Sequence, residues 1–267
     1  MDKVNLLNVR IDNLSKAELL DRLDPARGGV VFTPNVDHLM KLQVDKEFYE
    51  IYQAADYIVC DSQILICVAR FLGTPIREKI PGSDMFPAFY QHYKNDQRVK
   101  IFLLGGPPKS AQQAQKTINQ KVNREIVVGS HCPSYGFEAN HQECQEIVNL
   151  INRSDATVLA VGVGAPKQEK WILKHKEQLK NVKVFMAVGA AINFEAGILK
   201  RAPKWMRDVG LEWLYRLFCE PKRLWKRYLL EAFPFLWLIL QQRLSLYRDP
   251  IFYGKLSGQM ISRRTNA

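Results

Sequence analysis

The sequence predicts an α/β fold: a parallel sheet with helices on both faces, followed by a helical C-terminal appendage. Short, continuously apolar runs end in glycine or small polar residues, helical stretches lie between them, and this alternation stops after Gly189. Continuous apolar runs indicate strands that are covered on both faces. Strands that alternate with helices are typical of a parallel, Rossmann-like sheet.

The expected elements follow one another along the chain. The strand runs are 29–33, 57–61, 99–106, 126–129, 157–162 and 182–189. Stretches of helical length and composition include 110–122 and 138–152, and the pattern is helical and basic from Ala202 onward. We therefore expect an α/β domain over residues 1–195 and an appendage over residues 196–267.

The appendage carries most of the net positive charge of the chain. From Glu195 to Ala267 there are 14 Lys and Arg against 6 Asp and Glu, or +8 of a whole-chain +11. Four of the five tryptophans lie in the same stretch, interleaved with the basic residues. Cations beside amphipathic rings suit a surface that is anionic outside and apolar beneath. The appendage is therefore predicted to meet a membrane face or a phosphate-bearing partner.

The longest apolar run, Tyr228 to Leu240, is too short to cross a bilayer, which needs about 20 residues. It fits either a buried helix or an interfacial helix, and the adjoining Arg, Lys and Trp residues favour the interface. The first residues are polar where a signal peptide needs an apolar run, so we expect no export signal and a cytoplasmic protein.

Candidate site residues follow the predicted strands, because ligands gather at the carboxyl ends of strands in open parallel sheets. Asp61 ends the second strand run and could take a proton from a hydroxyl as a general base. A helix follows it, so Asp61 could instead be the N-cap of that helix.

Gly162 and Gly164 precede a helix, where small residues let a backbone approach a phosphate. The third glycine of a dinucleotide motif is absent and Lys167 stands in its place, so a tight strand–helix turn explains the pair equally well. Gln168 could hydrogen-bond a sugar or base, or could be a solvated residue of the first turn. His38 is expected to be a partly buried histidine with satisfied hydrogen bonds rather than a ligand.

Metal-binding patterns are absent from the sequence. There is no Asp-x-Asp pair and no Cys/His ligand spacing, so we expect no metal. If the chain transfers a sugar from a nucleotide diphosphate without a metal, Arg or Lys would have to neutralise the diphosphate that leaves. Arg216, Arg223 and Arg227 could do so, the latter two being one helical turn apart. The alternative is a solvated basic face, which the interleaved aromatic residues disfavour.

Several motifs together resemble the WecG/TagA/CpsF family of bacterial glycosyltransferases. In chain order they lie at Thr33–Leu39, Ala55–Asp61, Pro81–Asp84, Gly164–Glu169, Arg201–Met206, Gly210–Leu217 and Glu220–Leu224. The resemblance extends from about residue 5 to about residue 245, in the family's own order, and this agreement is more specific than any single motif.

The resemblance implies transfer of N-acetylmannosamine, or its uronic acid form, from a UDP donor. The implied acceptor is a sugar on a polyprenyl diphosphate at the inner face of the cytoplasmic membrane, and the products feed cell-envelope polysaccharides. The UDP-sugar is a substrate, and no cofactor is implied. The α/β domain would be the catalytic domain and bind the nucleotide sugar, while the appendage would contact the membrane and help complete the active site.

The resemblance also assigns residues. It places Asp61 at the proposed general base and makes Thr33, Asn35 and Gln168 polar site residues. It matches Arg216 and Arg223 to the arginines of the family's appendage. Asp84 closes the Pro81–Asp84 motif, which we expect to be a loop. Many family members carry Arg before that motif, where this chain has Lys79, a point charge rather than a bidentate fork.

A single well-placed carboxylate predicts one direct displacement with inversion, since double displacement needs a close pair. Two other classes of protein stay open as alternatives. A basic nucleic-acid-binding protein fits the charge, but the appendage resembles no nucleic-acid motif. An NAD-type enzyme fits the sheet, but it lacks the third glycine and the partner acid. An exposed apolar appendage would favour a homo-oligomer away from a membrane.

Overall fold

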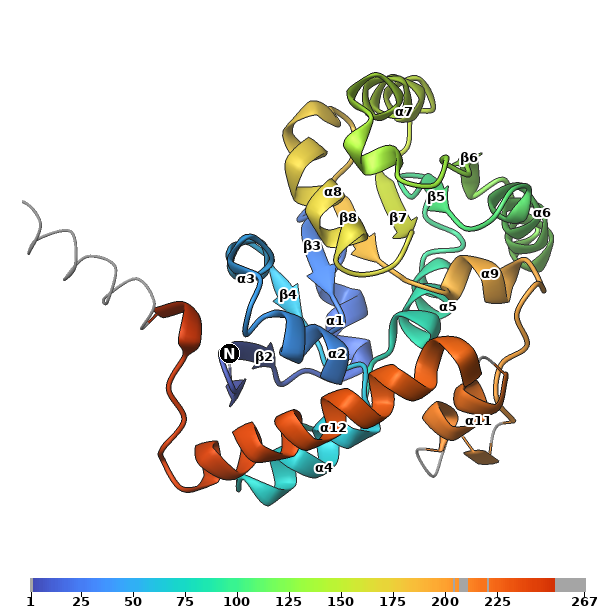
Figure 1. The fold of residues 1–267 in the computed structure, drawn as a ribbon. Coiled ribbons are helices and arrows are strands. Elements are labelled where there is room, and N and C mark those ends of the chain that lie inside the picture. The colour runs from blue at the N-terminus through green and yellow to red at the C-terminus, as the bar shows by residue number, and fades with distance from the viewer. Residues whose placement is uncertain (1, 204, 207–210, 220, 253–267) are drawn as a thin grey trace, which may run out of the picture.

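A computed structural model describes residues 2–203, 205–206, 211–219 and 221–252, with the side chains of residues 216 and 222–231 left out. Its centre is a six-stranded parallel sheet in the order β4-β3-β8-β7-β5-β6 (Figure 1). The strands are β3 (Gly29–Phe32), β4 (Tyr57–Ile58), β5 (Ile101–Gly105), β6 (Val127–His131), β7 (Val158–Gly162) and β8 (Val184–Ala187). All six predicted strand runs are confirmed, although β4 is shorter than expected.

Two helical layers cover the sheet, which confirms the predicted α/β architecture. One layer holds α2 (Val36–Lys41), α3 (Lys46–Gln53), α4 (Gln63–Phe71), α7 (His141–Arg153) and α8 (Lys167–His175). The other holds α1 (Lys16–Arg22), α5 (Gly82–His92), α6 (Ser110–Val122) and α9 (Ala191–Glu195). Strand side chains alternate between the two cores: Phe102 and Leu104 pack in the first, Ile101 and Leu103 in the second. A central strand such as β5 is therefore apolar on both faces, as its continuous apolar run predicts.

An antiparallel hairpin at the N-terminus was not predicted. It consists of β1 (Lys3–Leu6) and β2 (Val9–Asp12), which pair only with each other. The hairpin joins the sheet region through Asp12, whose Oδ2 accepts a 2.8 Å hydrogen bond from the backbone N–H of Ile58 in β4. Buried and exposed residues alternate in β1 and follow a mixed order in β2, so neither strand shows the continuous apolar run that predicted the central strands.

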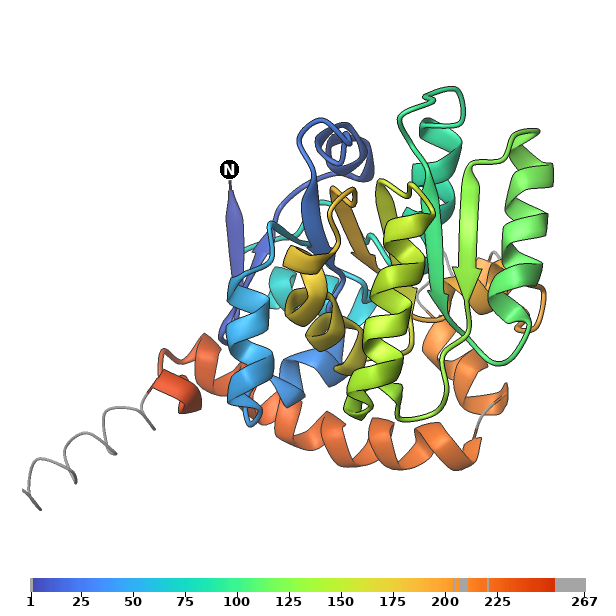
Figure 2. The ribbon, with the colours of Figure 1, turned by 90° about the horizontal axis from the view of Figure 1, so that it is seen from above.

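The appendage contributes α11 (Glu212–Cys219) and α12 (Pro221–Arg243) to the described structure. Helix α12 runs along one side of the α/β core, across α2 and α4 (Figure 2). Phe235 and Ile239 are buried in the same core as α2, so the apolar run enters the protein interior there. Within the described residues, no helix is both long and apolar enough to cross a membrane.

The position of α12 is fixed by polar contacts with the N-terminal hairpin. The side chain of Gln242 accepts a hydrogen bond from the N–H of Leu7 (2.8 Å) and donates one to the carbonyl of Asn5 (2.9 Å). Beyond the helix, the Tyr247 hydroxyl donates to Gln43 at 2.7 Å. The appendage is therefore held on the side of the sheet where α2 and α4 begin.

Candidate active site

The candidate site lies at the carboxyl edge of the sheet, where neighbouring strands send their helices to opposite faces. Strand β3 leads into α2 in one layer, and the adjacent β8 leads into α9 in the other. Such a division opens a crevice between the strand ends, the usual ligand site of open parallel sheets. Thr33 and Asn35 follow β3, Asp61 follows β4, and Gly164 follows β7 at this edge.

Asp61 is half-buried and held in place at the crevice. Its backbone N–H donates to the carbonyl of Pro34 at 3.1 Å, and its Oδ2 accepts a 3.3 Å hydrogen bond from the side-chain amide of Asn35. The N-cap alternative for Asp61 is wrong, because Ser62 caps α4 by accepting from the N–H of Ile64. A donor aimed at a carboxylate favours its ionised form, which a general base requires.

A buried histidine–glutamate pair stands behind Asn35. The Nδ1 of His38 lies 2.8 Å from the Oδ1 of Asn35, and its Nε2 lies 3.5 Å from the Oε1 of Glu169. His38 is 7% exposed and Glu169 1% exposed, so the expectation of a buried, hydrogen-bonded histidine is confirmed. With the Asn35 Oδ1 fixed by the ring, its amide nitrogen is left to face Asp61.

Negative charge gathers around this pair. Burial, together with the carboxylates of Glu169 and Asp61, raises the pKa of the Tyr52 hydroxyl well above its ordinary value. Sequence reasoning missed Glu169 as a site residue. The only available signal was its position at the end of the Gly164–Glu169 motif, since 131 residues separate it from His38.

Gln168 joins two glycine turns at the crevice. Its Oε1 accepts hydrogen bonds from the N–H of Gly164 (3.3 Å) and of Gly189 (3.2 Å), and its Nε2 donates to Glu169 at 2.8 Å. The side chain is 4% exposed, so the alternative of a solvated first-turn residue is wrong. In this structure the Gln168 amide fastens the turn after β7 to the turn after β8.

The glycines allow the strand ends to approach one another closely. A Cβ on Gly162 would lie 2.6 Å from the carbonyl oxygen of Gly189, closer than real side chains come. Gly164 has φ +87°, a backbone conformation that favours glycine. Only glycine therefore fits both positions, which explains the predicted tight turn and leaves the phosphate role a prediction.

The Pro81–Asp84 motif begins helix α5 and is not the loop expected from the sequence. Pro81 occupies the N-cap position of α5 without a side-chain cap hydrogen bond, and Gly82 packs beside Thr33 and Val188. Thr33 is 8% exposed at this contact. The motif therefore forms one wall of the crevice.

Asp84 is tied to the segment that leads into the appendage. Its Oδ1 lies 2.6 Å from the guanidinium of Arg201, which also donates to the carbonyl and hydroxyl oxygens of Ser83. Sequence reasoning missed this contact because Arg201 lies 117 residues further along the chain. The ion pair connects the crevice wall with the beginning of the appendage.

Lys79 lies beside the strand end that carries Asp61. The N–H of Ile80 donates to the carbonyl of Cys60 at 2.6 Å, so the Lys79 segment runs alongside the end of β4. Burial raises the pKa of the Cys60 thiol to about 12, and the Lys79 charge opposes this rise. A cation therefore stands near Asp61, although whether it binds a diphosphate stays a prediction.

The three candidate arginines lie on the appendage helices, and their side chains fall outside the described part of the structure. Arg216 belongs to α11, while Arg223 and Arg227 belong to the first half of α12. Helix α12 packs against α2, and α11 packs against α12. The roles of the three arginines stay predictions.

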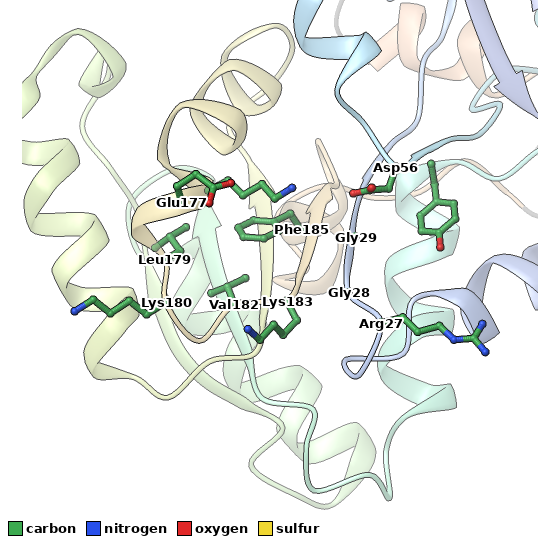
Figure 3. Close-up of a pocket in the computed structure, with 12 residues that line it drawn as sticks. Arg27, Gly28, Gly29, Asp56, Glu177, Leu179, Lys180, Val182, Lys183 and Phe185 are labelled. Carbon is green, nitrogen blue, oxygen red and sulfur yellow. The ribbon is translucent and has the colours of Figure 1, made fainter.

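A second cavity, of about 480 Å³, lies at the opposite, amino-terminal edge of the sheet. Figure 3 shows Arg27 and Lys180 on opposite sides of it, so these cations do not converge on one point. The Asp56 carboxylate beside it already accepts a 2.8 Å hydrogen bond from the N–H of Val30. The crevice at the carboxyl edge is therefore the better candidate for the active site.

Comparison with known proteins identifies the family. The model of the WecG/TagA/CpsF family of glycosyl transferases matches residues 4–249. The chain belongs to this family. It is therefore a glycosyltransferase, and the predicted resemblance is confirmed over nearly the whole chain.

Two curated relatives come from Staphylococcus aureus and are named N-acetylglucosaminyldiphosphoundecaprenol N-acetyl-beta-D-mannosaminyltransferase. The protein of strain MRSA252 is 28% identical over 233 residues, which cover 83% of this chain and 87% of the relative. The protein of strain NCTC 8325 is 27% identical over the same shares. Family membership favours a glycosyltransferase over both the NAD-type and the nucleic-acid alternative.

Proposed function

We propose that this glycosyltransferase moves N-acetylmannosamine, or its uronic acid form, from a UDP donor to a sugar on a polyprenyl diphosphate. The transfer inverts the sugar carbon, needs no metal ion, and serves cell-envelope polysaccharide synthesis. The names of the two relatives support the acceptor and the sugar. The observation that carries the proposal is the Asp61 carboxylate, held by Asn35 at the same carboxyl edge of the sheet as the glycine turns.

Asp61 acts as the general base. It takes the proton of the acceptor hydroxyl while the hydroxyl oxygen attacks the anomeric carbon and the bond to UDP breaks. The amide of Asn35 holds and aims the carboxylate, and the buried pair His38 and Glu169 orients Asn35. One carboxylate acting alone on the hydroxyl gives inversion, because no covalent sugar intermediate forms.

The leaving UDP needs positive charge. Helix α8 begins at the crevice without a side-chain cap, so the positive end of its dipole faces this region. Lys79 and the appendage residues Arg216, Arg223 and Arg227 add full charges, which removes the need for a divalent metal. Thr33 and Asp84 complete the polar wall on the opposite side.

The acceptor reaches the site from the inner face of the cytoplasmic membrane. Trp237, Leu244 and Leu246 are exposed apolar residues in and beyond α12, and the appendage to which they belong carries +8 of the chain's net charge of +11. Apolar side chains beside cations suit the boundary between headgroups and acyl chains. The protein would therefore associate peripherally with that face, which flotation with anionic vesicles over a salt series would test.

The central test is a UDP-release screen of nucleotide sugars with a short-chain polyprenyl-diphosphate N-acetylglucosamine. We expect UDP-N-acetylmannosamine or its uronic acid to be used, and the rate to be unchanged by EDTA. Asp61→Asn should lower the rate by at least about 100-fold, whereas Asp21→Asn, at an exposed carboxylate of α1, should not. Near-normal turnover of Asp61→Asn, or product with a retained anomer, would contradict the mechanism.

The appendage arginines need a separate test. The double change Arg216→Ala and Arg223→Ala should lower transfer to the lipid acceptor with little change in thermal stability. Unaltered kinetics would mean that these residues form a solvated basic face instead.

A further inference from the structure

An apolar groove of about 650 Å³ lies between α4 and the appendage. Nine of its ten lining residues are apolar, and Gln63 is the exception. Helix α4 forms one wall, the beginning of α11 closes one end, and the second half of α12 forms the other wall. The view in Figure 1 shows α12 lying along α4.

The walls of the groove hold large side chains that remain open to solvent. On α4, Ile64 is 41% and Phe71 54% exposed. Opposite them, Trp213 is 39%, Leu236 56% and Leu240 42% exposed. A contiguous apolar surface of this kind on a folded protein marks a binding site or an interface. An apolar ligand that filled the groove would cover these side chains.

The groove begins beside the proposed general base. Gln63 lies two residues after Asp61, is the first residue of α4 and lines the groove. From there the groove follows α4 to Phe71, a length of about 13 Å for a helix of this size. It therefore runs from the mouth of the crevice outward along the appendage.

The far end of the groove carries a cation. The guanidinium of Arg243 lies 6.0 Å from the centroid of the Phe71 ring. Beyond it, Leu244 and Leu246 are 58% and 65% exposed. A positive charge followed by apolar side chains fits the headgroup region of a membrane. The end near Asp61 faces the reaction, and the end near Arg243 faces the surface from which a lipid would arrive.

We propose that this groove binds the isoprene units of the acceptor that are closest to its diphosphate. This inference rests on the proposed function, in which the acceptor sugar lies at Asp61. The sugar is joined to the diphosphate and the diphosphate to the prenyl chain, so apolar surface must begin a short distance beyond the base. The groove meets this requirement in position, direction and chemistry.

The groove then determines which acceptors the enzyme uses well. Each isoprene unit that enters removes apolar area from water, so the chain length of the acceptor controls its affinity. Units beyond the groove stay in the bilayer and add no contact with the protein. Affinity should therefore rise over the first units and become constant once the groove is full.

The test is a chain-length series measured without vesicles or detergent. Acceptors with one, two, three and four isoprene units are compared in wild type, in Cys67→Trp, which fills the groove from α4, and in Leu236→Asn, which makes its α12 wall polar. Phe233→Asn is the matched control, because Phe233 is exposed on the same helix but does not line the groove. Thermal unfolding and donor KM check that each variant is folded.

We expect kcat/KM of the wild type to rise about ten-fold or more from the shortest to the longest acceptor. Cys67→Trp and Leu236→Asn should lose this rise and should differ least from wild type with the shortest acceptor, while Phe233→Asn should behave as wild type. An equal rise in all four proteins would overturn the groove proposal but leave the proposed function standing. The groove proposal would also be overturned if Leu236→Asn lost the rise in kcat/KM and at the same time dissociated a dimer, because a second copy of the chain would then occupy the groove.

A failure of the proposed function would look different, because no acceptor of any length would be used. Binding of farnesyl diphosphate, followed by calorimetry, tests the groove in that case. Wild type and Phe233→Asn should bind it, and Cys67→Trp and Leu236→Asn should bind at least about ten-fold more weakly. Equal affinities in the four proteins would exclude the groove as a prenyl site.

Discussion

Gln168 offers the sharpest perturbation of the crevice, because one side chain holds two turns together. Gln168→Ala removes the acceptor of the Gly164 and Gly189 N–H groups and the donor to Glu169. All three partners lie in or beside the crevice, and the Gln168 side chain is 4% exposed. Water has little access to replace the lost hydrogen bonds.

The size of the effect follows from the number of hydrogen bonds. A typical intramolecular hydrogen bond contributes about 1 kcal/mol net, and a buried partner left without one costs about 1–3 kcal/mol. The two contacts to backbone N–H groups, at 3.2 and 3.3 Å, are long, whereas the contact to Glu169 is 2.8 Å. We therefore expect a loss of about 2–4 kcal/mol in the free energy of unfolding.

The loss should be accompanied by weaker donor binding, since the glycine turns are the proposed cradle of the UDP moiety. Urea unfolding measures the stability, and calorimetry with UDP measures the affinity. Gln115→Ala is the control: its amide also makes two contacts, with Ser130 at 2.6 Å and the carbonyl of Val127 at 3.0 Å, but at the edge strand β6. It should lower stability and leave UDP affinity unchanged.

Two results would refute this reasoning. A Gln168→Ala protein as stable as wild type would mean that the turns hold their conformation without the side chain. A destabilised protein with wild-type affinity for UDP would mean that the turns are not part of the donor site. The same UDP loss in Gln115→Ala would show a general effect of instability instead.

Three further predictions concern stability. Phe235→Ala, which empties a buried position between α12 and the core, should cost about 3 kcal/mol in denaturant unfolding; a cost below about 1 kcal/mol would mean that α12 is not docked there. Gly106→Ala should lower the melting temperature, because its Cβ would lie 2.1 Å from the Ser110 Oγ at φ +81°, and an unchanged melting temperature would contradict this geometry. Burial against Trp171, with a smaller effect of a neighbouring lysine, lowers the pKa of His175 in the folded protein. The unfolded chain therefore binds the proton more readily, and the free energy of unfolding should fall as the pH drops through about 6.5. His175→Phe should reduce that fall between about pH 7.5 and 5.5.

The sheet could be predicted from sequence because burial on both faces leaves a local mark. A strand such as β5 needs apolar residues at every position, and that run is visible without knowledge of its neighbours. The hairpin of β1 and β2 leaves no such mark, because both of its strands include exposed residues among the buried ones. The Pro81–Asp84 motif was expected to be a loop because it contains proline and glycine. The prediction failed because these residues also occur where helices begin.

Residues of the candidate site could be predicted only where they directly follow a strand or begin the next helix. Asp61, Asn35 and Gln168 stand directly after strands or at the first turn of a helix, so the parallel topology brings them to one edge. The partners that hold them come from distant parts of the chain. Contacts such as His38 with Glu169 depend on how the helices pack, which no local pattern in a single sequence records.

The hydrogen bonds of Gln242 to Leu7 and Asn5 have a consequence for how the chain is made. The segment around Asn5 and Leu7 must wait until Gln242 has been synthesised before its contacts are complete, so this part of the fold forms late during translation of these residues. A chain whose synthesis stopped before Gln242 would have an α/β core with an uncovered apolar flank. Such a nascent chain would be a natural target for chaperones or proteases.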